Sequence, residues 1–226
     1  MTTFRSQPGV VTGLLRLQSV GFVYEDACPV LTSVSFDLSS SASTLIVGDN
    51  GSGKSTLGRL IAGLLVPTEG TVRVLGHRPS ALRSRERAPL VSYMGQVSHL
   101  QILTSTIARE TASFVKYAIR DNFDYDDWWQ VCSLPADRSI NPRDLSNPQL
   151  WRLLLLLYGL ALRPSLLVID EVLAPNDEEQ RRCLCAILKA RSRLGLATLL
   201  LYQRQVDVPL DTVLVLRHGS IKDVRA

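Results

Sequence analysis

Cysteine is scarce in this sequence and has no recognisable spacing. The 226 residues include four cysteines, and no two of them form a CxxC pair. Scattered cysteines without such pairs are typical of reduced thiols in cytosolic proteins. We therefore expect free thiols at Cys28, Cys132, Cys183 and Cys185.

Long hydrophobic runs are also missing. The longest apolar stretch runs from Leu150 to Leu162 and ends at Arg163-Pro164. It is shorter than the ~20 residues that a membrane-spanning helix needs, so it predicts a buried helix. Residues 1–13 are polar and contain no apolar segment, which predicts that there is no signal peptide. These absences predict a soluble chain and leave open its docking to a membrane partner.

The sequence has little net charge. Its formal charge is +4, and its basic residues are scattered apart from one cluster at Arg78, Arg83, Arg85 and Arg87. That cluster favours a solvated loop over a nucleic-acid surface, so no nucleic acid is expected as a partner. The apolar fraction of 46% is ample for the core of one α/β domain.

A glycine-rich segment follows the apolar run at residues 45–47. Residues 48–56 read Gly-Asp-Asn-Gly-Ser-Gly-Lys-Ser-Thr, which fits the template of two glycines separated by four residues and followed by Lys and Ser/Thr. The backbone N–H groups of such a loop form a nest for phosphate oxygens, and the next helix adds its positive end. Lys54 is placed to reach the β- and γ-phosphates, and Ser55 to ligate Mg²⁺. The segment predicts binding of a nucleoside triphosphate by Asn50, Gly51, Ser52, Gly53, Lys54, Ser55 and Thr56.

A second apolar run, at residues 166–169, ends in Asp170 and Glu171. An aspartate at the end of a parallel strand can hold Mg²⁺, directly or through water, beside a phosphate loop. Glu171 follows at the sheet edge where open α/β sheets bind ligands, and a carboxylate there can polarise an attacking water. The alternative is an acidic strand end in a surface salt bridge. The presence of the Lys54 loop in the same chain favours the catalytic interpretation.

Hydrophobic patterning predicts alternating strands and helices. Strands are expected at residues 14–17, 20–24, 34–38, 44–47, 71–75, 90–94, 166–170, 198–202 and, last in the chain, 213–216. Helices are expected after the phosphate loop to residue 65, from about 146, and at 178–194. Residues 77–90 look like a loop, and the poorly patterned region from about 100 to 145 looks like part of an inserted helical subdomain.

These motifs together resemble an ATP-binding-cassette (ABC) ATPase over nearly the whole chain. The resemblance implies an α/β P-loop NTPase fold with an N-terminal antiparallel β part and a mixed or parallel central sheet. It implies a single domain over residues 1–226, with a helical subdomain inserted at approximately 97–160. ATP and Mg²⁺ are the cofactors it implies.

The resemblance assigns further roles. Tyr24 falls where the family places an aromatic ring that stacks on adenine, although an ordinary strand aromatic is an open alternative. Gln96 falls at the loop that links the Mg²⁺ site to the helical subdomain, and Asp177 closes the dimer-contact loop. Such cassettes work as head-to-tail pairs, in which each nucleotide lies between one phosphate loop and the partner's signature motif.

Two motifs depart from the family pattern. The signature is Leu145-Ser146-Asn147-Pro148-Gln149 instead of Leu-Ser-Gly-Gly-Gln. Ser146 and Gln149 are kept, but Pro148 has no N–H to offer a phosphate, although the segment starts a helix well. Gln203 replaces the family's switch histidine and carries no charge. Losing one charge-assisted donor costs roughly 1.5–3 kcal/mol, so we predict tight ATP binding with slow hydrolysis by the isolated chain.

The segment after Gln96 looks like that of energy-coupling-factor importer ATPases. It has a second glutamine and an isoleucine, Gln101-Ile102, and then Thr104-Ser105-Thr106-Ile107 with Glu110. Those ATPases often pair unequally on a membrane scaffold and import vitamins or metal ions. The resemblance implies a second ATPase subunit and transmembrane subunits as partners, at the cytoplasmic face of the membrane. A generic importer or exporter ATPase and a non-catalytic regulatory cassette remain alternatives.

Overall fold

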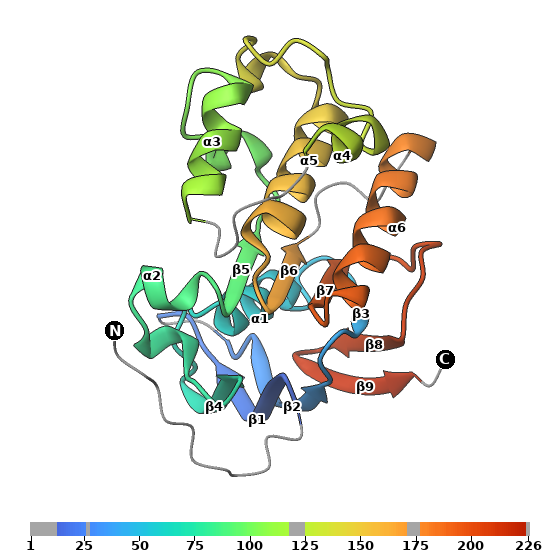
Figure 1. Cartoon of the computed structure of the whole chain (residues 1–226). Helices are drawn as coiled ribbons and strands as arrows, with labels where there is room; N and C mark the ends of the chain where they lie inside the picture. The colour runs from blue at the N-terminus through green and yellow to red at the C-terminus, as the bar shows by residue number, and fades with distance from the viewer. Residues whose placement is uncertain (1–12, 26–27, 118–124, 171–176, 225–226) are drawn as a thin grey trace.

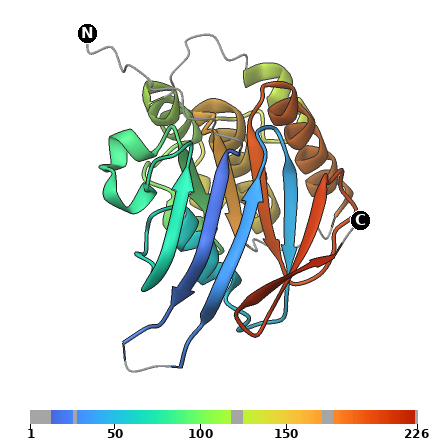
Figure 2. The same cartoon turned by 90° about the horizontal axis from the view of Figure 1, so that it is seen from below.

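The computed structural model describes residues 13–25, 28–117, 125–170 and 177–224. Its framework is two β-sheets (Figures 1 and 2). The smaller sheet is antiparallel and has the order β2 (Leu31–Leu38), β1 (Leu15–Phe22), β4 (Glu69–Val74). The larger sheet has the order β5 (Val91–Met94), β6 (Leu166–Asp170), β7 (Ala197–Tyr202), β3 (Ser43–Val47), β8 (Thr212–Arg217), β9 (Ser220–Val224). Its strands are parallel except for the antiparallel pair β8–β9. The predicted antiparallel part and mixed central sheet are therefore confirmed.

The larger sheet is buried on both faces. On β6, Leu166 and Val168 belong to the hydrophobic cluster around α1 (Lys54–Ile61) and the smaller sheet. Leu167 and Ile169 belong to the cluster formed with α5 (Asn147–Leu156) and α6 (Glu178–Arg193). Successive strand residues point to opposite faces, so burial on both faces explains why this strand reads as one continuous apolar run.

Six further helical segments lie in the described ranges outside α1, α5 with its continuation, and α6. They are η1 (Pro79–Ala81), α2 (Ser84–Arg87), η2 (Ser98–Gln101), α3 (Ile107–Tyr117), α4 (Tyr125–Val131) and η3 (Pro142–Asp144). Figure 1 shows α3, α4 and α5 at the end of the molecule away from the smaller sheet. The prediction of a loop over residues 77–90 is wrong in part, because η1 and α2 lie there. The Glu86 carboxylate stabilises the start of α2 by accepting from the Arg83 N–H at 3.1 Å.

The apolar stretch 150–162 is helical and buried, as predicted, but its second half is a π-helix. α5 continues into η4 (Leu157–Leu162), and the helix ends at Arg163, whose φ is 51°. The fully buried guanidinium of Arg191 donates to the Gly159 carbonyl at 2.8 Å, in the middle of η4. None of the helices in the described ranges has the length and apolar character needed to cross a membrane.

Two strand predictions are corrected by the structure. Residues 14–17 and 20–24 were expected to form separate strands, but 15–22 form the single strand β1, whose register with β2 shifts between Leu17 and Val20. The strand at 213–216 is not the last one. His218 and Gly219 have φ of 48° and 72° and turn the chain back into β9. Positive φ at two successive residues suits a tight antiparallel hairpin, and the polar Ser-Ile-Lys-Asp-Val sequence of β9 gives no apolar run to reveal it.

Candidate functional site

The phosphate loop joins the end of β3 to the start of α1. Gly51 and Gly53 have φ of 78° and 99°, in the left-handed region that favours glycine. Gly48 is required for space, because a Cβ atom there would lie 2.4 Å from the Leu216 carbonyl oxygen. The shape of the loop therefore depends on its glycines, and the last of them, Gly53, is the N-cap of α1.

Two polar side chains of this loop suit a bound anion. The buried Lys54 folds back so that its Nζ donates to the carbonyl oxygens of Gly48 at 2.7 Å and Asp49 at 3.0 Å. The buried hydroxyl of Ser52 has no hydrogen-bond partner among the described residues. A buried unpaired hydroxyl beside a helix N-terminus and a cation is well placed to donate a hydrogen bond to a phosphate oxygen.

The three side chains predicted to hold magnesium converge on one point. The Ser55 hydroxyl donates to Asp170 Oδ1 at 3.1 Å, and Gln96 Nε2 donates to Ser55 Oγ at 3.4 Å. Asp170 is fully buried at the end of β6. Ser55, Asp170 and Gln96 would offer hydroxyl, carboxylate and amide oxygens, which are the kinds of ligand that Mg²⁺ takes beside phosphate oxygens and water. Among the described residues no group of three or more His, Cys, Asp or Glu exists that would form an all-protein metal site. The hydroxyl, carboxylate and amide that meet here fit Mg²⁺ bound together with a phosphate.

Tyr93 is a member of this cluster that the sequence did not reveal. It lies on β5, next to β6, and its hydroxyl donates to Asp170 Oδ2. Burial raises the pKa of Tyr93, and the hydrogen bond to Asp170 raises it further, so the phenol stays protonated as a donor. Both carboxylate oxygens of Asp170 are thus held, one by Ser55 and one by Tyr93. Only its place at the end of a strand that pairs with β6 could have signalled this contact.

The segment that follows Gln96 is held by side-chain hydrogen bonds. The Gln101 amide brackets Gly95, accepting from its N–H at 3.4 Å and donating to its carbonyl at 3.0 Å. The fully buried Glu110 accepts from the N–H of Thr104 at 2.8 Å and from its hydroxyl at 2.7 Å. The second glutamine therefore holds Gly95, next to Gln96, and the Thr-to-Glu stretch fixes the chain at Thr104, before α3.

Tyr24 lies at the edge of the phosphate-loop helix. Its hydroxyl is 3.2 Å from Thr56 Oγ1, and its ring packs edge-to-face on Phe22 with centroids 4.8 Å apart. The residue is 39% exposed, so part of its surface is open to solvent. This placement beside the nucleotide loop suits the predicted contact with adenine.

The signature segment caps α5. Ser146 is the N-cap, and Gln149 Oε1 accepts from the Ser146 N–H at 3.2 Å and from its hydroxyl at 3.1 Å. Asn147 Oδ1 lies 3.0 Å from His99 Nε2, on the turn that follows Gln96. The predicted helix start is confirmed. The Ser146 hydroxyl and Gln149 Oε1 are bonded to each other, and among the described residues none of their hydrogen bonds reaches the phosphate loop.

The remaining predicted residues lie around the sheet edge. Gln203 is exposed and directly follows Tyr202, which pairs with Val47 just before the phosphate loop. Asp177 is the N-cap of α6 and accepts from the Gln180 N–H at 2.6 Å. Glu171 follows Asp170 in the sequence but lies outside the described residues. Its predicted role is therefore not tested by this structure.

Curated relatives match most of this chain. An Enterococcus faecalis protein named energy-coupling factor transporter ATP-binding protein EcfA1 is 29% identical over 217 residues, covering 92% of this chain and 77% of that protein. A Lactiplantibacillus plantarum protein whose name places it among ABC transporter ATP-binding proteins is 29% identical over 215 residues. The chain spans only 38% of the length of that second relative.

The fold matches that of a solved cassette. The dimeric structure of MJ0796, a bacterial ABC transporter cassette, superimposes with a TM-score of 0.77, covering 94% of this chain and 99% of that one at 19% sequence identity. This likeness confirms the predicted P-loop NTPase fold. A family model described as ABC transporter matches residues 31–174, and the chain therefore belongs to the ABC transporter family as an ATP-binding cassette.

Proposed function

We propose that this chain is the ATP-binding subunit of an energy-coupling-factor-type membrane transporter that imports a micronutrient, a vitamin or a metal ion. The observation that carries the nucleotide part is the convergence of Ser55, Gln96 and Asp170 beside the Lys54 loop. The bonds from Gln101 to Gly95 and from Thr104 to Glu110 support the importer branch, as does the likeness to EcfA1. The proposal treats residues 1–226 as one cassette with a helical subdomain at about 97–160.

The residues divide the work at the site as follows. The loop N–H groups, Lys54 and Thr56 bind the triphosphate, and Tyr24 contacts adenine. Ser55, Gln96 and Asp170 hold Mg²⁺, which neutralises charge on the phosphates when bound. Glu171 polarises the attacking water, and Gln203 offers an uncharged donor to the γ-phosphate.

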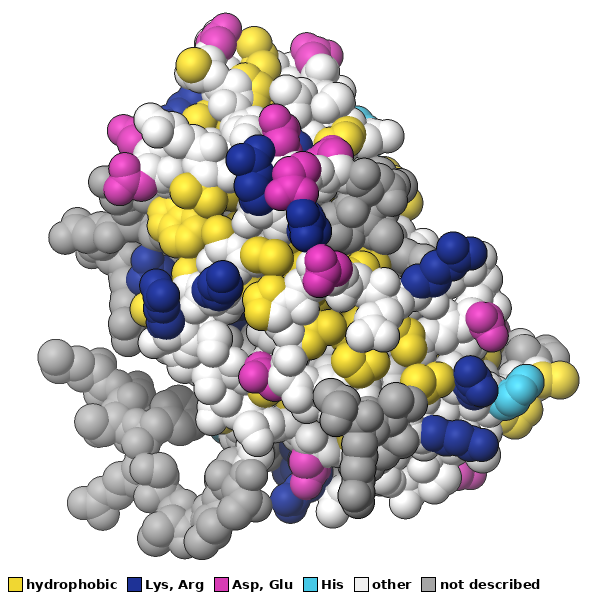
Figure 3. Space-filling model, turned by 90° about the vertical axis from the view of Figure 1, so that its right-hand side faces the viewer, with side chains coloured by type: hydrophobic (Ala, Val, Ile, Leu, Met, Phe, Trp, Pro, Cys, Tyr) yellow, Lys and Arg dark blue, Asp and Glu magenta, His cyan; other side chains and the backbone are white. Residues whose placement is uncertain are grey.

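A complete site requires a second cassette. Ser146 and Gln149 cap α5 and do not contact their own phosphate loop, so in this proposal they face the nucleotide of a paired ATPase subunit. Transmembrane subunits anchor the pair at the cytoplasmic face of the membrane. Nucleic acid is not a partner in this proposal, because the basic residues are scattered along the chain apart from the cluster Arg78, Arg83, Arg85 and Arg87. On the one face shown in Figure 3, basic and acidic side chains are interspersed.

Nucleotide binding and turnover test this function together. We expect the isolated chain to bind ATP in a magnesium-dependent manner and to hydrolyse it far more slowly than the enzyme median of about 10 s⁻¹. In the native complex, Glu171→Gln should lower turnover and leave ATP binding intact. Failure of the wild-type chain to bind ATP would refute the proposal.

A regulatory cassette, in which ATP holds a dimer closed without hydrolysis, is the second candidate. The observation in its favour is the signature segment, where Ser146 and Gln149 bond to each other and Pro148 replaces a phosphate-binding N–H. The same variant separates the two candidates. A native complex with measurable turnover that Glu171→Gln abolishes excludes the regulatory cassette.

A further inference from the structure

Arg152 is a buried cation on the signature helix. It lies six residues after the N-cap Ser146, or about 9 Å along α5, and only 3% of its surface is exposed. A guanidinium cannot lose its proton at ordinary pH, so burial requires partners for its charge. The structure supplies these partners from two other segments of the chain.

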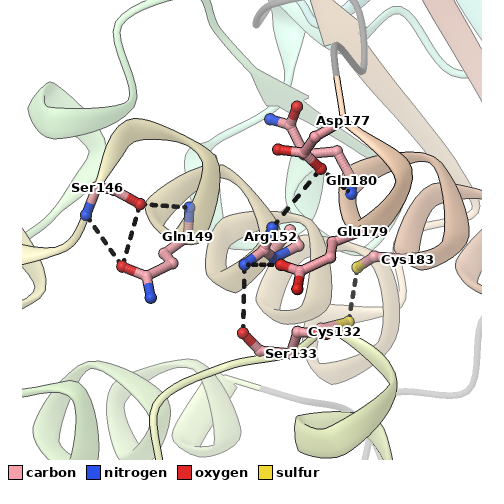
Figure 4. A network of polar contacts seen from close by, with 9 residues as sticks. All are labelled: Cys132, Ser133, Ser146, Gln149, Arg152, Asp177, Glu179, Gln180 and Cys183. Carbon is pink, nitrogen blue, oxygen red and sulfur yellow. Dashed lines mark hydrogen bonds and ion pairs between the residues drawn. The ribbon is translucent and has the colours of Figure 1, made fainter.

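The partners of Arg152 lie on α6 and at the end of α4 (Figure 4). Its Nη2 lies 2.9 Å from Glu179 Oε2, and its Nη1 lies 3.9 Å from Asp177 Oδ1. Nη2 also donates to the Ser133 carbonyl, just after α4, at 3.2 Å. The cation thus meets the carboxylates of the N-cap and first turn of α6 and the carbonyl of Ser133, which follows the end of α4.

Asp177 has two roles in this network. Its Oδ1 caps α6 by accepting from the Gln180 N–H at 2.6 Å, and the same oxygen faces Arg152. The Nε–H of Arg152 has no hydrogen-bond partner among the described residues. The guanidinium is therefore oriented toward the carboxylates at the expense of one of its own donors.

We propose that Arg152 is a positioning residue that couples the signature segment to Asp177, which closes the predicted dimer-contact loop. This inference rests on the proposed function, because both of these segments would face the paired cassette. Ser146 starts the helix that carries Arg152, and Asp177 is the first described residue after the segment that contains Glu171. In this proposal the guanidinium transmits any movement of α5 to Asp177. The signature segment and Asp177, which both face the paired cassette, therefore keep a fixed position relative to each other.

The exposure of the partners makes this coupling testable without loss of the fold. The side chains of Asp177 and Glu179 are 43% and 48% exposed, so water solvates both carboxylates when the arginine is removed. Arg152→Met fills much of the space and leaves no buried charge. Removing both carboxylates would instead leave a buried guanidinium unpaired, which is far more costly.

Amide hydrogen exchange of the full chain gives a readout that requires neither ATP nor a partner. In Arg152→Met we expect exchange of the Gln180 amide, which donates to Asp177, to rise about tenfold, equivalent to about 1.4 kcal/mol. Arg152→Lys, which keeps the charge but loses the planar fork, should give an intermediate rise. ATP affinity of the isolated chain should stay within about twofold, because the phosphate loop is on a different element.

The assembled ATPase provides the functional readout. We expect kcat of the native complex to fall about tenfold in Arg152→Met at an unchanged KM, since positioning of the paired surfaces is lost while nucleotide binding is retained. Arg181→Gln is the matched control. Arg181 also pairs with two carboxylates, on Glu178 and Asp207, but its side chain is 41% exposed, so we expect no change in exchange at Gln180 or in kcat.

The outcomes separate this inference from the proposed function. Unchanged Gln180 exchange and unchanged kcat in Arg152→Met, with only a lower thermal midpoint, would show that Arg152 is an ordinary structural bridge. If Arg152→Met raises exchange at Gln180 but the wild-type chain does not bind ATP, the contact between Arg152 and Asp177 is upheld. The proposed ATP-binding function, on which the coupling rests, is then overturned. Should Arg152→Met fail to fold, Glu179→Gln removes the 2.9 Å ion pair alone and must raise the exchange at Gln180.

Discussion

Tyr93→Phe is expected to weaken magnesium-dependent ATP binding while leaving magnesium-free binding intact. The change removes the hydroxyl that donates to Asp170 Oδ2 but keeps the ring, which packs between β5 and α1. Asp170 is fully buried, so no water replaces the lost donor easily. Among the described residues, the Ser55 hydroxyl, at 3.1 Å from Oδ1, is then the remaining hydrogen-bond donor to the carboxylate.

The size of the effect follows from the kind of bond that is lost. A hydrogen bond to a charged group contributes about 1.5–3 kcal/mol, and loss of a group that orients a metal ligand costs about 10–100-fold in metal affinity. In a titration of ATP binding against magnesium, the midpoint should therefore rise about 10–100-fold. Binding measured with a chelator present should change less than about twofold, since the phosphate loop is untouched.

Tyr158→Phe is the matched control for this experiment. Tyr158 is another partly buried tyrosine, but it packs edge-to-face on Phe114 with centroids 5.1 Å apart, and neither residue belongs to the magnesium cluster. Loss of the Tyr158 hydroxyl should leave the magnesium midpoint of ATP binding unchanged. An unchanged midpoint in Tyr93→Phe itself would refute the idea that Tyr93 orients Asp170 for the metal.

Three further predictions concern the loop, the core and the response to pH. Lys54→Ala should abolish ATP binding measured by calorimetry, because it removes the cation of the phosphate loop; retained affinity would contradict its role. Arg191→Met should lower the free energy of unfolding in urea by about 3–5 kcal/mol, since it leaves buried acceptors around η4 unpaired, whereas the exposed Arg193→Met should change it by less than about 0.5 kcal/mol. Burial, and secondarily the charge of Glu110, raise the pKa of Tyr158 above its ordinary value of 10.0. The folded state therefore favours the neutral phenol, and this stabilises the fold at pH values below 10.0. The stabilisation is lost as the pH rises above 10.0, where the unfolded chain ionises first. The free energy of unfolding in urea, measured below and above pH 10.0, should accordingly fall less for Tyr158→Phe than for the wild type.

The parts of the site that the sequence revealed are contiguous motifs. The glycine-rich loop with Lys54 and the apolar run ending in Asp170 carry their chemistry within a few residues, so local geometry dictates their placement. The helix start at Ser146 was predictable for the same reason, because an N-cap residue with proline in the first turn is a local pattern.

The parts that it did not reveal are contacts between distant segments. Tyr93 and Asp170 are 77 residues apart, and His99 and Asn147 are 48 apart. Such pairs depend on strand order and helix packing, which hydrophobic periodicity does not specify. The π-helix escaped prediction likewise, since it coincides with a carbonyl that Arg191 reaches from α6. β9 was missed because its pairing partner and the positive φ of His218, not its own composition, make it a strand.

Co-purification from native membranes tests the central claim most directly. The chain would be tagged, extracted in mild detergent with ATP and magnesium, and its partners identified by mass spectrometry. The account predicts a second cassette with a regular signature and histidine, together with small membrane proteins whose substrate-binding member indicates the cargo. Recovery of this chain alone, or with soluble proteins only, would contradict its assignment as a transporter subunit.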